Sequence, residues 1–199
     1  MSIWSYGKTL SMGMSIALSL VACAKSFDMA GERLTPLGPE WGVVIGSVLV
    51  KQASLADKST KSDANLPTYE FDIVQSQPGD PEGESPYAER YHLQAKEGEE
   101  RMFISRLRTG RYLVKTFAKE GITGTGGDLD LIFDTMAGEV RYIGRLLVEV
   151  PQRVSRGKEY RFTVENAREG MLRQISDRHA EMAVQAVDAP LRSREPSAR

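Results

Sequence analysis

Cysteine and histidine are almost absent from this chain, and neither sign of charge is in excess. Cys23 is the only cysteine among 199 residues, so no disulfide can form within the chain. Two histidines and one cysteine do not make a cluster that would suggest a zinc site. The 26 Lys and Arg residues stand against 27 Asp and Glu, which gives no overall positive field for attracting nucleic acid. The sequence therefore predicts a domain held together by packing, with no metal, no cofactor and no nucleic-acid partner.

Signatures of catalysis are also missing. The sequence contains no GxSxG, HExxH or phosphate-binding Walker pattern. Its two histidines, His92 and His179, lie in stretches that predict a strand face and a helix stripe, where a surface or packing role is the simpler interpretation. We therefore expect that the protein is not an enzyme.

No hydrophobic run is long enough to cross a membrane as a helix without falling short of the bilayer core. Between Lys8 and Lys25 there are 16 uncharged residues. As a helix they would cover roughly 24 Å, less than the roughly 30 Å of a bilayer core. A basic residue, an apolar segment and then small residues are the order of a secretory signal peptide. Residues 1–22 are therefore predicted to be a signal peptide.

The end of this segment, Leu20-Val21-Ala22-Cys23, resembles the lipobox of bacterial lipoproteins. The resemblance implies cleavage between Ala22 and Cys23, diacylglycerol on the Cys23 sulfur and acylation of the new amino terminus. Ala24 stands where Asp would resemble an inner-membrane retention signal. We therefore expect a lipid-anchored, periplasm-facing outer-membrane protein, with the inner membrane or the cell surface as alternatives. An ordinary signal peptide, or a reduced cytoplasmic thiol, is the competing interpretation.

The mature chain is predicted to begin with a tether and to continue as one β-rich domain. Residues 23–40 mix charges and prolines without periodicity, which is typical of a linker that lifts a domain off the bilayer. Residues 41–165 contain about eight short apolar or alternating runs between Gly/Pro turns, which favours an antiparallel sandwich or barrel. One long strand is predicted to place on a single face Val140, Tyr142, Leu146, Val148 and Val150.

A helix and a tail complete the predicted order. Asn166 can cap a helix over residues 166–187, where apolar residues recur at three- and four-residue steps and form one stripe for packing on the sandwich. Residues 188–199 carry arginines and prolines and are predicted to be a disordered tail.

A second resemblance covers residues 108–175, about a third of the chain. It is carried by Gly110-x-Tyr112 at the start of a strand and by the run from Ala137 to Gly144, AGEVRYIG. These motifs resemble uncharacterised bacterial lipoproteins with a transthyretin-like or carboxypeptidase-regulatory-like domain. The resemblance implies a prealbumin- or immunoglobulin-like β-sandwich that serves adhesion, assembly or ligand display.

Two loops are the candidates for binding. Residues 121–128 are glycine-rich and lead into Asp128 and Asp130, whose spacing puts two carboxylates on one face of a strand, as a calcium site would need. Residues 76–87 hold three prolines and several carboxylates. A plain hairpin connection and a surface loop are the simpler interpretations of these segments.

For function, the sequence favours a non-enzymatic binding or assembly module on the membrane. Its partner would be an envelope protein or a cell-wall polymer, and lipid on Cys23 would hold it at the membrane. The alternative is a small-ligand or polysaccharide binder that uses loops 76–87 and 121–128, and an envelope hydrolase is the least favoured possibility.

Overall fold

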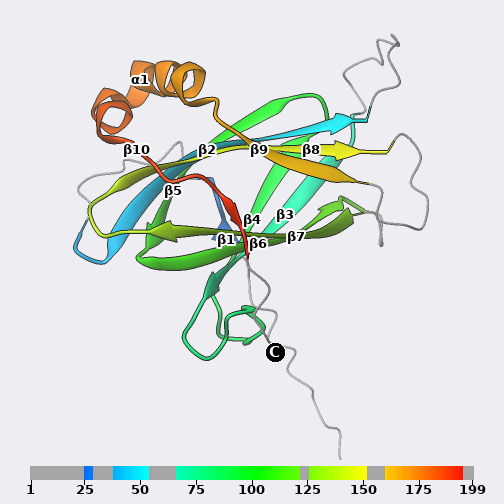
Figure 1. Cartoon of the computed structure of the whole chain (residues 1–199), viewed down its shortest axis with the longest axis horizontal. Coiled ribbons are helices and arrows are strands. Elements are labelled where there is room, and N and C mark those ends of the chain that lie inside the picture. The colour runs from blue at the N-terminus through cyan, green and yellow to red at the C-terminus, as the bar shows by residue number, and fades with distance from the viewer. Residues whose placement is uncertain (1–24, 29–37, 54–65, 122–125, 152–159, 195–199) are drawn as a thin grey trace, which may run out of the picture.

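The computed structural model describes residues 25–28, 38–53, 66–121, 126–151 and 160–194 (Figure 1). Within these residues the fold is mainly β with one helix, as the sequence predicts. Its long elements are β2 (Trp41–Gln52), β3 (Thr68–Ser76), β4 (Arg90–Lys96), β5 (Glu100–Arg108), β6 (Gly110–Lys119), β7 (Gly126–Thr135), β8 (Val140–Val150), β9 (Arg161–Glu165) and α1 (Arg168–Gln185). Three two-residue strands accompany them: β1 (Lys25–Ser26), β10 (Val187–Asp188) and β11 (Arg192–Ser193).

The strands form two sheets. One has the order β1-β4-β3-β6-β7-β11, and the other has the order β10-β8-β2-β5 with β9 paired to β8. Both are mixed, because β1 runs parallel to β4 while β8 runs parallel to β2 and to β10. The expected purely antiparallel arrangement is therefore wrong at these pairs. Alternation of apolar and polar residues shows which face of a strand is buried, but it does not show the direction of the neighbouring strand.

Two apolar clusters hold these layers together. The larger cluster lies between the sheets, because it unites side chains of both, such as Phe71 and Leu131 from one and Val48 and Leu146 from the other. The smaller cluster lies on the other face of the second sheet, where α1 covers it. The second sheet is thus buried on both faces over part of its area, which explains the nearly continuous apolar run in β2.

A β-bulge in β8 changes which face its side chains use. Opposite Gly46 of β2, the strand has two residues, Ile143 and Gly144, and Gly144 has a positive φ of 95°. Val140 and Tyr142, before the bulge, therefore pack beneath the helix, in the smaller cluster. The later apolar residues pack between the sheets instead: Leu146, Val148 and Val150. The strand is confirmed, but the prediction that all five residues share one face is wrong.

The chain before β2 is more ordered than a tether. Lys25 and Ser26 pair with Tyr91 and His92 of β4, and Phe27 is only 1% exposed in the larger cluster. The predicted tether over residues 23–40 is therefore wrong for residues 25–28, because one apolar ring gains a place between the sheets. Residues 29–37 lie outside the described residues.

The chain after the helix is also packed. Val187 and Asp188 pair with β8, Leu191 is buried between the sheets, and β11 pairs with β7. The predicted disordered tail over residues 188–199 is therefore wrong up to Arg194, beyond which the chain is not described.

The helix itself begins later than predicted. Ala167 occupies the N-cap position, while the side-chain oxygen of Asn166 accepts the N–H of Arg168 at 3.1 Å. The N–H of Ala167 is instead bound by the hydroxyl oxygen of Tyr142 at 2.8 Å. Tyr142 of β8 therefore binds the start of the helix to the sheet. Within the helix, the backbone of His179 departs from helical geometry, with φ of −141° and ψ of 57°.

Candidate binding groove between β5 and the helix

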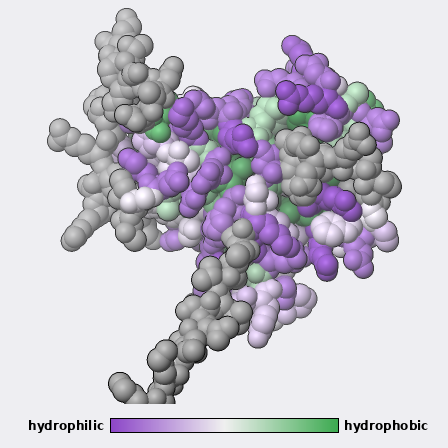
Figure 2. Space-filling model, turned by 180° about the vertical axis from the view of Figure 1, so that it is seen from behind, coloured by the Kyte–Doolittle hydropathy of each residue, from purple (hydrophilic) through white to green (hydrophobic). Residues whose placement is uncertain are grey.

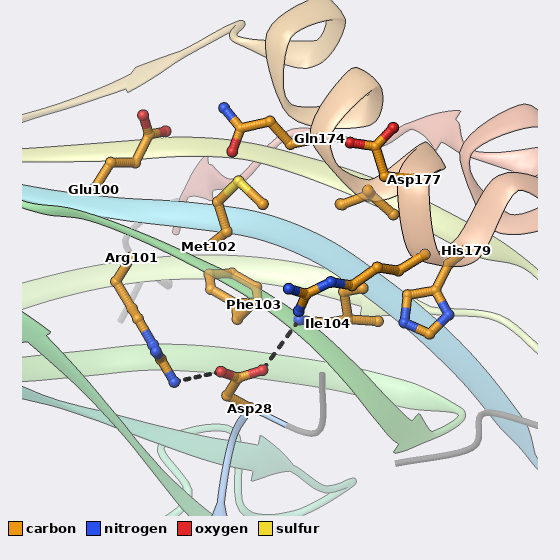
Figure 3. Close-up of a pocket in the computed structure, with 11 residues that line it drawn as sticks. Asp28, Glu100, Arg101, Met102, Phe103, Ile104, Gln174, Asp177 and His179 are labelled. Carbon is orange, nitrogen blue, oxygen red and sulfur yellow. Dashed lines mark hydrogen bonds and ion pairs between the residues drawn. The ribbon is translucent and has the colours of Figure 1, made fainter. Parts of the chain in front are cut away.

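A groove of about 460 Å³ runs between β5 and α1 (Figure 3). One wall comes from β5, the other from the helix, and Asp28 of the N-terminal segment lies at its end. The lining residues are Asp28, Glu100, Arg101, Met102, Phe103, Ile104, Gln174, Ile175, Asp177, Arg178 and His179. Segments that are far apart in the sequence therefore build one hollow.

The position of β5 in the sheet keeps one side of the groove open. It is the last strand in the order β10-β8-β2-β5, so within the described residues no long strand pairs with its outer edge. Met102 and Ile104 lie two positions apart and so point to the same face, toward the smaller cluster and Ile175 of the helix. The groove thus has an apolar floor beside an exposed strand edge, which is an arrangement that extended peptides use.

Asp28 closes part of that edge. Its carboxylate lies 2.5 Å from the guanidinium of Arg101 and accepts the backbone N–H of Ile104 at 3.5 Å, as the dashed lines of Figure 3 show. The hydroxyl of Ser105 donates to the carbonyl of Phe27. The N-terminal segment therefore bridges the first sheet to the edge of the second one.

The helix wall is polar around one apolar side chain. Gln174, Asp177 and His179 face the groove from α1 (Figure 3), and Ile175 is buried against the sheet. His179 stands at the kink of the helix, where the backbone leaves helical geometry. The wall presents both hydrogen-bond donors and acceptors to an occupant.

A charged network lies next to the groove on the same face of the sheet. Arg145 donates two hydrogen bonds of 2.8 Å to the carboxylate of Glu100, and Ser47 donates a third of 2.7 Å. Burial opposes the charge of Glu100, but these hydrogen bonds and the charge of Arg145 outweigh it and lower the pKa of that carboxyl. The hydrogen bonds to Glu100 and Glu165, and the charges of these two carboxylates, in turn raise the pKa of Arg145. Glu100 therefore contributes a fixed negative charge at the end of the groove.

The residues predicted from the sequence as sites have different outcomes. Cys23 and Ala22 lie outside the described residues. Asp128 and Asp130 are both exposed on one face of β7, as predicted, and Asp130 has a positive φ of 48°. Their backbone carbonyls accept hydrogen bonds from Tyr160 and Arg194. Across the part of the chain that the structure describes, no group of three or more His, Cys, Asp or Glu side chains could hold a metal ion.

The carboxylates of loop 76–87 are bound within the domain. Asp80 accepts the backbone N–H groups of Glu84 and Ser85 at 2.9 and 2.8 Å. Glu82 pairs with Arg194, and Glu84 lies 3.5 Å from Lys115. A wide hollow of about 770 Å³ lies beside the loop, lined by residues 76–79, 81, 109–111 and 134–136. Of loop 121–128, the structure describes residue 121 and residues 126–128.

Sequence reasoning did not find the groove. His92 is exposed on β4 and does not line the groove, whereas His179 does, although both were predicted to have a surface or packing role. The one available signal was indirect: Phe27, an isolated aromatic residue in a polar stretch, packs between the sheets and precedes Asp28 of the groove. On the face seen in Figure 2, hydrophilic side chains predominate and hydrophobic ones form small areas between them.

Comparisons with known proteins add little to this picture. No protein-family model matches the sequence, and no curated protein matches it. Its fold is similar over 70% of its length to part of a leucine-rich repeat protein from Bacteroides thetaiotaomicron, with 11% identity and a TM-score of 0.33. The matched part is 16% of that protein, and a likeness this weak carries no argument. Among the described residues, no helix combines the length and the apolar character that a membrane crossing needs.

Proposed function

We propose that this protein is a membrane-anchored envelope lipoprotein that works as a non-enzymatic binding module. Its anchor would be lipid on Cys23, as the LVAC motif implies, and Ala24 in place of an Asp favours the outer membrane as its location. Its partner would be an envelope protein, held as an extended segment in the groove between β5 and α1. The observation that carries the binding role is this groove, with its apolar floor beside a strand edge.

The chemistry of the groove suits a peptide. The outer edge of β5 can offer backbone groups to an added strand, while Met102 and Ile104 offer an apolar floor for alternate side chains. Arg101 and Glu100 place opposite charges at one end, so an occupant with both signs would be accommodated. The two facing sheets also support the proposed transthyretin-like sandwich, although both sheets contain parallel as well as antiparallel strand pairs.

The alternative of a small-ligand binder has one observation in its favour, the hollow beside loop 76–87. That hollow is lined mainly by small, polar and proline residues and by Met136, and it lacks the aromatic lining of a typical ligand pocket. The groove is therefore the better candidate.

Site-specific photocrosslinking in cells tests the binding role. A photoreactive residue replaces Met102 in the groove, and a matched variant carries it at Met136, a methionine 48% exposed in the β7–β8 turn. We expect one discrete adduct from position 102 only, and mass spectrometry should map it to a short segment of the partner. In a second experiment the photoreactive residue replaces Arg178, on the helix side of the groove. The additional change Met102→Glu should then abolish capture of the partner. Equal adducts at both methionines, or none at position 102, would contradict the proposal.

The anchor is tested separately. Cys23→Ser should leave an unprocessed precursor without acyl chains, because the sulfur is the atom that accepts the lipid. Normal maturation of this variant, measured by mass spectrometry, would argue against a lipoprotein.

A further inference from the structure

The first strand of the described domain lies very close in the sequence to the proposed lipid. Lys25, the first residue of β1, follows Cys23 by two residues. Two residues span at most about 7 Å between Cα atoms. The polar headgroup layer on each side of a bilayer is itself about 5–8 Å thick. A lipidated Cys23 would therefore leave no room for a tether, and β1 would start at the headgroups.

The direction of β1 shows which end of the domain would meet the bilayer. β1 runs parallel to β4, with Lys25 opposite Tyr91. The chain upstream of Lys25 therefore approaches from the end at which β4 begins, where the loop between β3 and β4 arrives. The ammonium group of Lys25 lies 3.3 Å from the carboxylate of Glu89, the last residue of that loop. Figure 1 shows this loop projecting from the body of the two sheets.

Tyr87 is the most exposed large apolar side chain of the described residues, and it belongs to this loop. It is 87% exposed, although its neighbour Ala88 is buried. The N–H of Tyr87 donates to the hydroxyl of Ser85 at 3.2 Å, and the N–H of Ala88 donates to the carbonyl of Ser85 at 3.1 Å. The fold therefore holds a tyrosine ring outward on a bound turn, two residues from the partner of Lys25. Tyrosine has an apolar ring and a polar end, and it is enriched at membrane interfaces.

Three acidic side chains at this end form ion pairs within the domain. Glu89 pairs with Lys25, Glu84 with Lys115 and Glu82 with Arg194. Local pairing reduces the repulsion that an acidic loop would otherwise meet at anionic lipids.

We propose that the end of the domain formed by Lys25, Glu89 and residues 77–89 docks on the bilayer surface, with the Tyr87 ring among the lipid headgroups. The proposal rests on the lipidation of Cys23 in the proposed function. Docking at this end fixes the orientation of the domain and leaves the groove between β5 and α1, on the second sheet, open to partners.

A depth measurement on the lipidated protein tests the docking. Because lipid would occupy the Cys23 sulfur, an introduced cysteine is the only free thiol of the mature chain. Tyr87→Cys is labelled with a small fluorophore in vesicles of phosphatidylethanolamine and phosphatidylglycerol that contain lipids with a quencher on the headgroup. Val184→Cys is the matched control, since Val184 is apolar and 85% exposed on α1. Glu120→Cys is a second control. β6 starts next to this loop, where Arg111 pairs with Ser76, and Glu120 follows its other end, about 30 Å along the strand.

We expect headgroup quenching at position 87 to exceed that at positions 184 and 120 by at least about threefold. Mass spectrometry of the same sample reports the acyl chains on Cys23. Acylated protein with equal quenching at the three positions would overturn the docking alone. Protein without acyl chains would overturn the proposed anchor, and the docking with it.

Discussion

Replacing Phe27 by alanine measures how much the N-terminal segment contributes to the fold. The ring is 1% exposed and stands edge-on to the rings of Tyr91, Phe103 and Phe133, with centroids 6.0, 5.1 and 6.2 Å away. Removing a buried Phe side chain costs about 3–5 kcal/mol, and edge-to-face pairs of this kind place Phe27 in the upper part of that range. We therefore expect Phe27→Ala to lower the free energy of unfolding by about 4–5 kcal/mol. A segment that acted only as a linker would give a change near zero.

Urea unfolding of the purified protein, followed by the fluorescence of Trp41, gives this quantity. With a slope of about 2 kcal/mol per molar urea, the midpoint should fall by about 2 M. Phe27→Leu should lose a smaller part of the stability, and Ser26→Ala, at the exposed neighbour, about 0.5 kcal/mol or less. A Phe27→Ala midpoint equal to that of the wild type would refute the packing of this segment.

Three further changes test other contacts. Tyr142→Phe leaves the N–H of Ala167 without its acceptor, so we expect a loss of about 1–2 kcal/mol in urea unfolding, and no loss would remove this link between sheet and helix. Because the pKa of Glu100 is lowered, its contribution to the free energy of unfolding is present above about pH 4.3 and is lost as the pH falls. The free energy of unfolding should therefore fall less steeply with acid in Glu100→Gln than in the wild type. Identical pH profiles of the two proteins would contradict this. Burial and the charge of Glu97 raise the pKa of Tyr69 to about 12, above the usual value of about 10. The contribution of this shift to the free energy of unfolding is therefore present below about pH 10 and is lost as the pH rises above it. Absorbance at alkaline pH should therefore show one late-titrating phenol fewer in Tyr69→Phe.

Much of the fold could be predicted from local patterns. Runs such as Tyr69-Phe71-Ile73 and Leu129-Leu131-Phe133 alternate with polar residues, and each is a strand with one buried face. Alternation depends on the strand itself and its own two faces, which is why it can be read locally. It fails at Gly144, where one extra residue turns the remaining side chains of β8 to the other face. Nothing in the spacing of the apolar residues marks that position.

The ends of the domain and the groove could not be predicted in the same way. Lys25–Asp28 and Leu191 owe their order to strands that are distant in the sequence, and a single apolar residue is a weak local signal. The groove combines Asp28, β5 and the middle of α1, so its residues meet only after the sheets have formed. The proposed anchor motif is the opposite case, because the enzymes that process lipoproteins would recognise a short linear segment.

The four residues from Lys25 to Asp28 have a mechanical consequence. Tension on the chain upstream would act along the axis of β1 and shear its pairing with β4, rather than open it one bond at a time. The strand cannot slide until the Phe27 ring has left the space between the sheets, and Asp28, next in the chain, is tied to β5 at the groove. A pull between an anchor and a molecule seated on β5 would thus run through Phe27, and the resistance of that ring to extraction would set the force at which the two separate.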